Sequence, residues 1–281
     1  MNMTRSLIFT SLALMLSAGI SVTDIHASGE AVTEKAKITA VEAGELYIPS
    51  KDAMADLKTG FDTAQGSNKL ALVVMGANWC HDSRALAARL FKEPLSTVID
   101  AHYEVIFIDV GYLENGKEVI SSLGIPVYYA TPTVLIVDPL SREVLNADDR
   151  NQWGNAYKIS MKESVDYFAQ YAETGQSTTQ SDGEPDENLQ VLIANIKAFE
   201  DVQAARLYEA YAVLTPMIKA YKEGDEKAFS EKIWNEVRDY RFKVSEDVVV
   251  LRAEARERVA AGETDIRLSY PDYPAFSWDM K

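Results

Sequence analysis

The chain has a single cysteine, Cys80, and three histidines among its 281 residues. One cysteine cannot form an internal disulfide, so the apolar core must stabilise the fold without covalent cross-links. A structural zinc site needs about four convergent ligands, and Cys80 with one or two histidines falls short of that number. The sequence therefore predicts no metal site and no cofactor.

Basic residues are also scarce, with 28 Lys and Arg against 43 Asp and Glu and a formal net charge of −15. Such a surface repels nucleic acid and anionic lipid, so we expect neither as a partner. The hydrophobic content of 47% and the charged content of 25% are typical of a folded globular protein. No Ser-His-Asp order, glycine-rich phosphate loop or pair of catalytic carboxylates stands out.

Long hydrophobic runs are missing, because none reaches the roughly 20 residues of a membrane-spanning helix. Residues 7–20 are mostly apolar and follow Arg5, a pattern typical of a signal-peptide core. Ala27 is a candidate last residue of that peptide, and a cut nearer Gly19 is the alternative. The sequence predicts export to the periplasm or the medium, with no stable membrane span after cleavage. A retained anchor or a buried helix is the competing interpretation.

Short apolar runs in the first half predict an α/β layer fold. Continuous runs at 70–77, 103–111 and 131–139 predict strands buried on both faces, as in a parallel or mixed central sheet. Helical patterns flank these strands, a turn separates the first helix from the first strand, and a hairpin partner follows the third strand. The helical patterns occupy 51–58, 83–91 and 161–173, the turn 61–69 and the hairpin partner 141–146.

The second half predicts a hairpin of two long helices. Helical spacing runs through 188–214, Pro216 kinks or restarts that helix, and Gly224 ends it. From 229 to 259 apolar residues follow an eleven-residue repeat, which keeps the stripe almost straight along one helix. Antiparallel packing within the chain is favoured over a self-associating coiled coil, because a neighbouring amphipathic helix is available.

Composition changes divide the chain into segments. Residues 174–187 lack large apolar side chains and are rich in Ser, Thr, Gly and acids, which indicates a flexible linker. The final residues hold four aromatics and two prolines, so we expect them to lie against a domain surface. The predicted segments are a signal peptide (1–27), an extended lead-in (28–50), an α/β domain (51–174), a linker (175–187), a helical hairpin domain (188–262) and an aromatic, proline-rich tail (263–281).

The single cysteine lies in the sequence WCHDS, residues 79–83, between the first buried strand and a helix. The first turn of a helix presents unpaired N–H groups and the positive end of the helix dipole, and both favour a thiolate. A charged His81 would stabilise the thiolate further, whereas the negative charge of Asp82 would destabilise it. Ser83 is placed to donate a hydrogen bond from its hydroxyl to the sulfur. As adjacent residues diverge on a helix, His81 and Asp82 are not expected to act as a pair.

Together with Thr131-Pro132 at the start of the third strand, this segment resembles the thioredoxin superfamily over residues 51–173. The resemblance implies a thioredoxin-like mixed sheet flanked by helices. It also implies a cis peptide bond before Pro132, with that proline beside the Cys80 sulfur. Thr131 would then offer backbone hydrogen bonds to a substrate, and Trp79 and His81 would shape the surface that contacts it.

The sequence departs from the dithiol members of that superfamily at two positions. Ser83 replaces the second cysteine, which attacks the mixed disulfide and releases the substrate, and Val74 stands where those members tend to carry a buried acid. Three hypotheses remain: Cys80 exchanges disulfides with the help of an outside thiol, it captures cysteine-containing client proteins as mixed disulfides, or the domain is a non-catalytic binding module. The expected partners are such client proteins or a small thiol.

Overall fold

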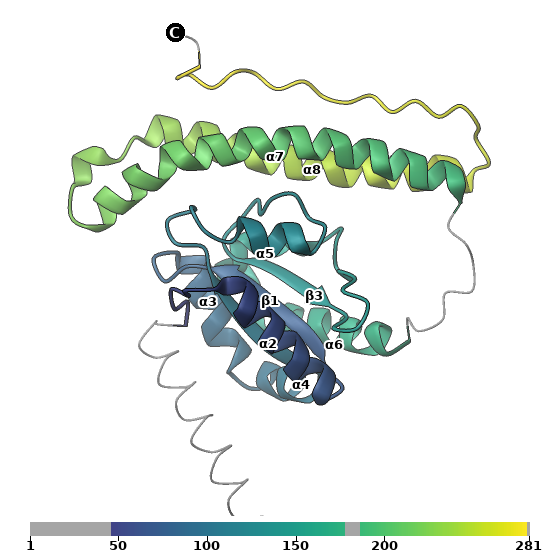
Figure 1. Cartoon of the computed structure of the whole chain (residues 1–281), viewed down its shortest axis with the longest axis horizontal. Coiled ribbons are helices and arrows are strands. Elements are labelled where there is room, and N and C mark those ends of the chain that lie inside the picture. Colours follow the sequence, from purple (N-terminus) through teal and green to yellow (C-terminus); the bar gives the residue numbers. More distant parts are fainter. Residues whose placement is uncertain (1–45, 178–185, 280–281) are drawn as a thin grey trace, which may run out of the picture. The chain divides into compact units, whose positions relative to one another are not determined.

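A mixed three-stranded sheet forms the centre of the computed structural model, which describes residues 46–177 and 186–279 (Figure 1). The strand order is β2-β1-β3, with β1 parallel to β2 and antiparallel to β3. The bounds are Leu70–Gly76 for β1, Tyr103–Asp109 for β2 and Thr133–Val137 for β3. The three continuous apolar runs therefore form three strands, as predicted.

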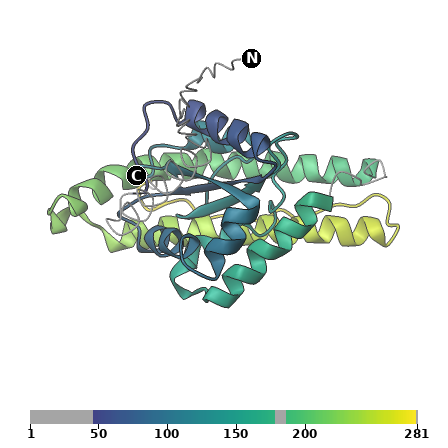
Figure 2. The ribbon, with the colours of Figure 1, turned by 90° about the horizontal axis from the view of Figure 1, so that it is seen from below.

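Helices cover both faces of this sheet (Figure 2), and alternate residues of β1 and β3 face opposite ways. One face carries Leu72, Val74 and Ile136 and packs against α3 (His81–Leu90), α4 (Leu95–His102) and α6 (Met161–Ser177). The other face carries Val73, Met75 and Leu135 and packs against α2 (Ala53–Gly66) and α5 (Lys117–Ser122). Burial on both sides explains why these strands are uniformly apolar.

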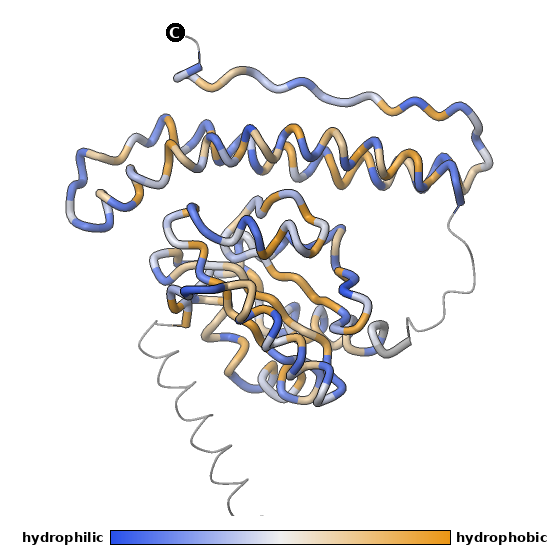
Figure 3. The backbone as a smooth tube through the Cα atoms, viewed as in Figure 1, coloured by the Kyte–Doolittle hydropathy of each residue, from blue (hydrophilic) through white to orange (hydrophobic). Residues whose placement is uncertain are grey.

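Helices α7 (Glu187–Lys222) and α8 (Glu231–Ala260) form the predicted hairpin. Pro216 lies inside α7 without ending it, and a short 3-10 helix, η2 (Glu226–Ala228), lies in the connection. Hydrophobic and hydrophilic residues alternate along both helices (Figure 3), and the buried ones lie on the predicted stripe. The buried hydrophobic positions of α8 are Val237, Tyr240, Val244, Val248, Leu251 and Ala255, and Arg241 and Ser245 are buried beside them.

The hairpin packs against the α/β layer through the segment that precedes β3. The Tyr211 hydroxyl donates to the backbone oxygen of Tyr128 at 2.7 Å, and the Thr215 hydroxyl donates to that of Tyr112 at 2.9 Å. Buried side chains of both parts belong to one hydrophobic cluster. The predicted division at a linker stays a prediction, because residues 178–185 lie outside the described ranges.

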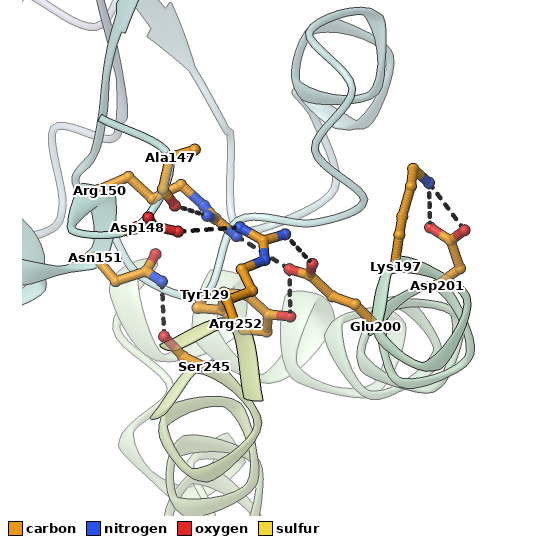
Figure 4. A network of polar contacts seen from close by, with 10 residues as sticks. All are labelled: Tyr129, Ala147, Asp148, Arg150, Asn151, Lys197, Glu200, Asp201, Ser245 and Arg252. Atoms are coloured by element: carbon orange, nitrogen blue, oxygen red, sulfur yellow. Dashed lines mark hydrogen bonds and ion pairs between the residues drawn. The ribbon is translucent and has the colours of Figure 1, made fainter. Parts of the chain in front are cut away.

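A buried ionic network joins the same two parts (Figure 4). Glu200 on α7 is 0% exposed, and its carboxylate accepts hydrogen bonds from Arg150 at 3.0 Å, Arg252 at 2.9 Å and the Tyr129 hydroxyl at 3.0 Å. Burial lowers the pKa of Arg150, whereas the neighbouring Glu200 raises it. Three elements distant in sequence are therefore tied to a single carboxylate.

The tail lies against the hairpin. Phe276 is buried and packs edge-on against Tyr240, with ring centroids 5.1 Å apart. The Arg206 guanidinium lies over both of these rings, 4.7 Å from the centroid of Tyr240 and 4.5 Å from that of Phe276. Phe276 is covered as predicted, whereas Tyr270 stays exposed.

Several local predictions were wrong. Helix α2 continues to Gly66 through the predicted turn, and the predicted hairpin partner of β3 is reduced to one bridge between Val137 and Val144. A 3-10 helix that was not predicted, η1 (Arg150–Lys158), carries Trp153, which stacks against Phe168 in the core. The short helices α4 and α5 were not predicted.

The predicted signal peptide, 1–27, lies outside the described residues, as does most of the lead-in, 28–50. Within the described ranges, no helix has the length and hydrophobicity needed to cross a bilayer.

Candidate functional site

Cys80 occupies the N-cap position of α3, four residues after Gly76, the last residue of β1. No side chain caps this helix end by a hydrogen bond, so the sulfur lies where the first-turn N–H groups are unpaired. The residue is 8% exposed. The predicted strand-to-helix position of the thiol is therefore confirmed, and the helix terminus is oriented to stabilise negative charge on it.

The structure brings Thr131 to the sulfur from the other side. The Cys80 thiol donates to the Thr131 backbone oxygen at 3.1 Å, and the Thr131 hydroxyl donates to the sulfur at 3.4 Å. The peptide bond between Thr131 and Pro132 is cis, the geometry that the resemblance implies. Two residues 51 positions apart thus form one contact across the start of β3.

Ser83 does not play the part that the sequence analysis gave it. It is 0% exposed, and its hydroxyl accepts from the Ala77 backbone N–H at 3.4 Å. Among the described residues it makes no hydrogen bond to the Cys80 sulfur. One helical turn after the N-cap, the side chain points inward, where a Cβ on Gly76 would lie only 2.6 Å from its oxygen. Ser83 fills a buried site behind the thiol.

Tyr47 is a neighbour that the sequence analysis missed, because it lies in the predicted lead-in. Its hydroxyl donates to the backbone oxygen of Ser83 at 3.2 Å. Burial raises the pKa of Tyr47, and proximity to Cys80 raises it further, while a hydrogen bond with the Ser83 side chain lowers it. Tyr47 therefore stays protonated and closes the inner side of the site. An aromatic residue in an otherwise weakly patterned segment was the only sequence signal.

Trp79 is held by the loop after β2. Its indole N–H donates to the Gly111 backbone oxygen at 2.7 Å, and its ring stacks on that of Tyr112 at a centroid distance of 6.4 Å. Asp109 supports the same loop, because its carboxylate accepts from the Gly111 N–H at 3.2 Å. Trp79 is thus a fixed wall beside the thiol, as the resemblance implies.

Replacing Asp109 with asparagine is expected to stabilise the protein at pH 7. Burial raises the pKa of Asp109, the N–H of Gly111 lowers it, and Glu114 raises it again, with a net rise. The pKa of Asp109 is higher in the folded than in the unfolded protein. Its contribution to stability therefore falls as the pH increases from the unfolded pKa to the folded one. The amide keeps the bond to Gly111 without the charge.

The expected gain at pH 7 is below about 1 kcal/mol, because the carboxyl is only half-buried. It should shrink towards pH 4, where the carboxyl of the natural protein takes up a proton. Chemical denaturation at both pH values measures this, with the exposed Asp100→Asn on α4 as control. A gain of equal size at both pH values would contradict the electrostatic origin.

His81 and Asp82 form a pair, contrary to the expectation that adjacent residues diverge. The His81 Nε2 atom lies 3.1 Å from a carboxylate oxygen of Asp82. The other oxygen of Asp82 accepts from the Tyr157 backbone N–H at 2.8 Å, which fixes the buried carboxylate. His81 remains largely exposed (68% for its side chain), so it folds over the acid from the solvent side.

A pocket of about 230 Å³ opens at the thiol, and the helical hairpin provides one of its walls. Trp79, Cys80 and Thr131 line it from the α/β layer, and Tyr221, Phe229, Trp234 and Arg241 line it from the hairpin region. The sequence leaves two roles open for the hairpin, covering the thiol face or dimerisation, and this wall corresponds to the first. Arg241 carried a signal, since it follows Val237 by four residues and precedes Val244 by three, which places a charge on the buried stripe.

No group of three or more His, Cys, Asp or Glu side chains in the described part of the chain is arranged to hold a metal ion. His102 lies at the end of α4, in a different element from His81. The chemistry that these residues offer is that of a single sulfur.

No family model matches the chain, and no curated protein matches it. A solved structure described as a disulphide isomerase from Xylella fastidiosa Temecula1 shares 30% sequence identity, with a TM-score of 0.40. That match covers 44% of this chain and 95% of the other.

Proposed function

We propose that this protein is an exported thioredoxin-like protein that carries out thiol–disulfide exchange through Cys80 without a resolving cysteine. The observation that supports this proposal most is the position of the Cys80 sulfur. It lies at the N-terminus of α3, in contact with Thr131, and on the wall of a pocket. The thiolate is the reactive form in disulfide exchange, and a helix N-terminus is where it is stabilised.

The reaction is a sulfur-for-sulfur substitution. The Cys80 thiolate attacks one sulfur of a disulfide, a new disulfide to Cys80 forms, and the other sulfur leaves as a thiolate that takes a proton from water. In the free protein the Cys80 thiol donates a hydrogen bond to the Thr131 backbone oxygen. This hydrogen bond is lost when the disulfide forms, because the sulfur no longer carries a proton. The Thr131 backbone oxygen is then available to an N–H group of the bound partner.

Completion of the cycle requires an outside thiol. The thiolate of a small thiol or of a second protein attacks the mixed disulfide, regenerates Cys80 and carries the partner's sulfur away. Ser83 cannot replace it, because a hydroxyl forms no disulfide. The proposed activity is therefore exchange or capture, and the partners are cysteine-containing proteins or small thiols.

Expression of Cys80→Ala beside the natural protein in the host tests this proposal. Exported and cytosolic fractions are separated under non-reducing conditions, and covalent conjugates are identified by mass spectrometry. We expect conjugates in the exported fraction with the natural protein, their loss on reduction, and their complete absence with Cys80→Ala.

The outcomes separate the three hypotheses. Conjugates that persist until a thiol is added indicate capture, whereas conjugates that turn over indicate exchange. If none form and Cys80 alkylates no faster than an unperturbed thiol, the domain is a non-catalytic binding module. That alternative is supported by the low exposure of Cys80 and by the hydrogen bond that its protonated form makes.

A further inference from the structure

Arg241 is a buried cation on the wall of the Cys80 pocket. It is 7% exposed, forms no ion pair with a carboxylate of the described residues, and its Nε atom has no hydrogen-bond partner there. Its guanidinium lies over the rings of Trp234 and Phe242, at 5.5 and 5.3 Å. Arginine stays charged in proteins, and a buried charge without a counter-ion is costly.

The hydroxyl of Tyr211 does not remove this imbalance. Burial raises the pKa of Tyr211, whereas the charge of Arg241 and a hydrogen bond with it hold that rise down. A neutral phenol solvates the guanidinium in part but supplies no negative charge. The comparison with Glu200, which is matched by two arginines, shows how this fold treats its other buried charges.

The remaining charges at the pocket leave it cationic. Asp82 is the one carboxylate among its lining residues, and both of its oxygens are engaged, by Tyr157 and by His81. Lys222 adds a second positive charge at the hairpin side. In a chain with a net charge of −15, a buried guanidinium and an exposed lysine that line the same pocket as the thiol leave it locally cationic.

We infer that Arg241 binds a carboxylate of the thiol or disulfide that reacts with Cys80, so that the substrate class is a small, carboxylate-bearing thiol compound. This inference rests on the proposed function and adds substrate selection to it. The planar guanidinium suits a carboxylate, which it binds through two parallel hydrogen bonds. A pocket of about 230 Å³, walled partly by the hairpin, has room for a small molecule.

Three small disulfides of different charge test the inference on the full chain. They are the disulfide of 3-mercaptopropionate (two negative charges), the disulfide of 2-mercaptoethanol (neutral) and cystamine (two positive charges). Each places a mercaptan on Cys80 and releases one equivalent of the same mercaptan. The rate of the mass increase on Cys80 is measured with the natural protein, Arg241→Gln and Arg241→Lys.

We expect the natural protein to react about tenfold or more faster with the anionic disulfide than with the neutral one. Arg241→Gln should lose this preference, because the rate with the anionic disulfide falls further than the rate with the neutral one, and Arg241→Lys should retain part of it. Arg238→Gln is the matched control on α8, because Arg238 pairs with Asp239 and does not line the pocket. Equal unfolding temperatures of the variants establish that they are folded.

Two results would overturn substrate selection alone. One is a preference for the anionic disulfide that survives Arg241→Gln. The other is that Arg241→Gln slows the reaction equally with all three probes, which would mean that Arg241 affects the reactivity of Cys80 and not the choice of substrate. If Cys80 reacts with none of the probes, the proposed function fails and this inference with it. A measurement without variants is protection of natural Cys80 from the anionic probe by propionate but not by propanol.

Discussion

Replacing Glu200 with glutamine is expected to lower the free energy of unfolding by about 3–5 kcal/mol, because it leaves the guanidinium of Arg150 buried without its counter-ion. Arg150 is itself almost fully buried, and Arg252 loses the same partner. Glutamine keeps the size of the side chain and an acceptor for Tyr129, so the loss reports the charge and not a cavity. Guanidinium unfolding followed by circular dichroism measures it.

Glu209→Gln on the same helix is the control, because Glu209 is exposed. It should change stability by less than about 0.5 kcal/mol. A loss below about 1 kcal/mol for Glu200→Gln would equal that of an exposed ion pair. The network would then not be what holds the hairpin on the α/β layer.

Replacing Ser83 with cysteine is expected to shorten the lifetime of mixed disulfides on Cys80 by about 100-fold or more. A thiol at position 83 lies one helical turn from the bonded sulfur, so its attack is intramolecular and has a very high effective concentration. It would form a disulfide with Cys80, reduce the partner and release it. The measurement is the decay of a purified mixed disulfide without added thiol, followed by mass spectrometry.

Ser83→Ala is the matched control, because it is nearly the same size and contains no sulfur. It should leave the decay unchanged, as Ser83 makes no hydrogen bond to the Cys80 sulfur among the described residues. An unchanged lifetime with Ser83→Cys would mean that the buried position cannot reach the bonded sulfur. The buried residue Val74 of β1 offers no acid to assist proton transfer. Release of the partner would therefore remain slower than in a dithiol site that contains a buried acid.

The fold was largely predictable where burial dictates the pattern. Strands β1 and β3 have helices on both faces, so only apolar residues fit and the runs are continuous. The stripe of α8 was readable because one face is buried along most of the helix. The segment around Cys80 was recognisable because its chemistry depends on local order: strand, cysteine, helix.

The missed features depend on contacts between distant segments. Nothing local distinguishes Glu200 from the exposed acids of α7, since its burial follows from the docking of Arg150 and Arg252. Tyr47 meets the backbone of Ser83 from 36 residues earlier in the chain, a contact that no local pattern reveals. Helix α5 is six residues long, too short for a helical period to show.

Because the hairpin forms one wall of the pocket, access to the Cys80 thiol depends on how the hairpin is docked. Tyr221, Trp234 and Arg241 line the pocket at the thiol only while α7 and α8 stay docked, and the carboxylate of Glu200 anchors that docking from another place on α7. The speed at which a reagent reaches Cys80 is therefore a gauge of how tightly two helices are seated. The reactivity of Cys80 thus reports on the docking contact of Glu200, which lies more than a hundred residues further along the chain.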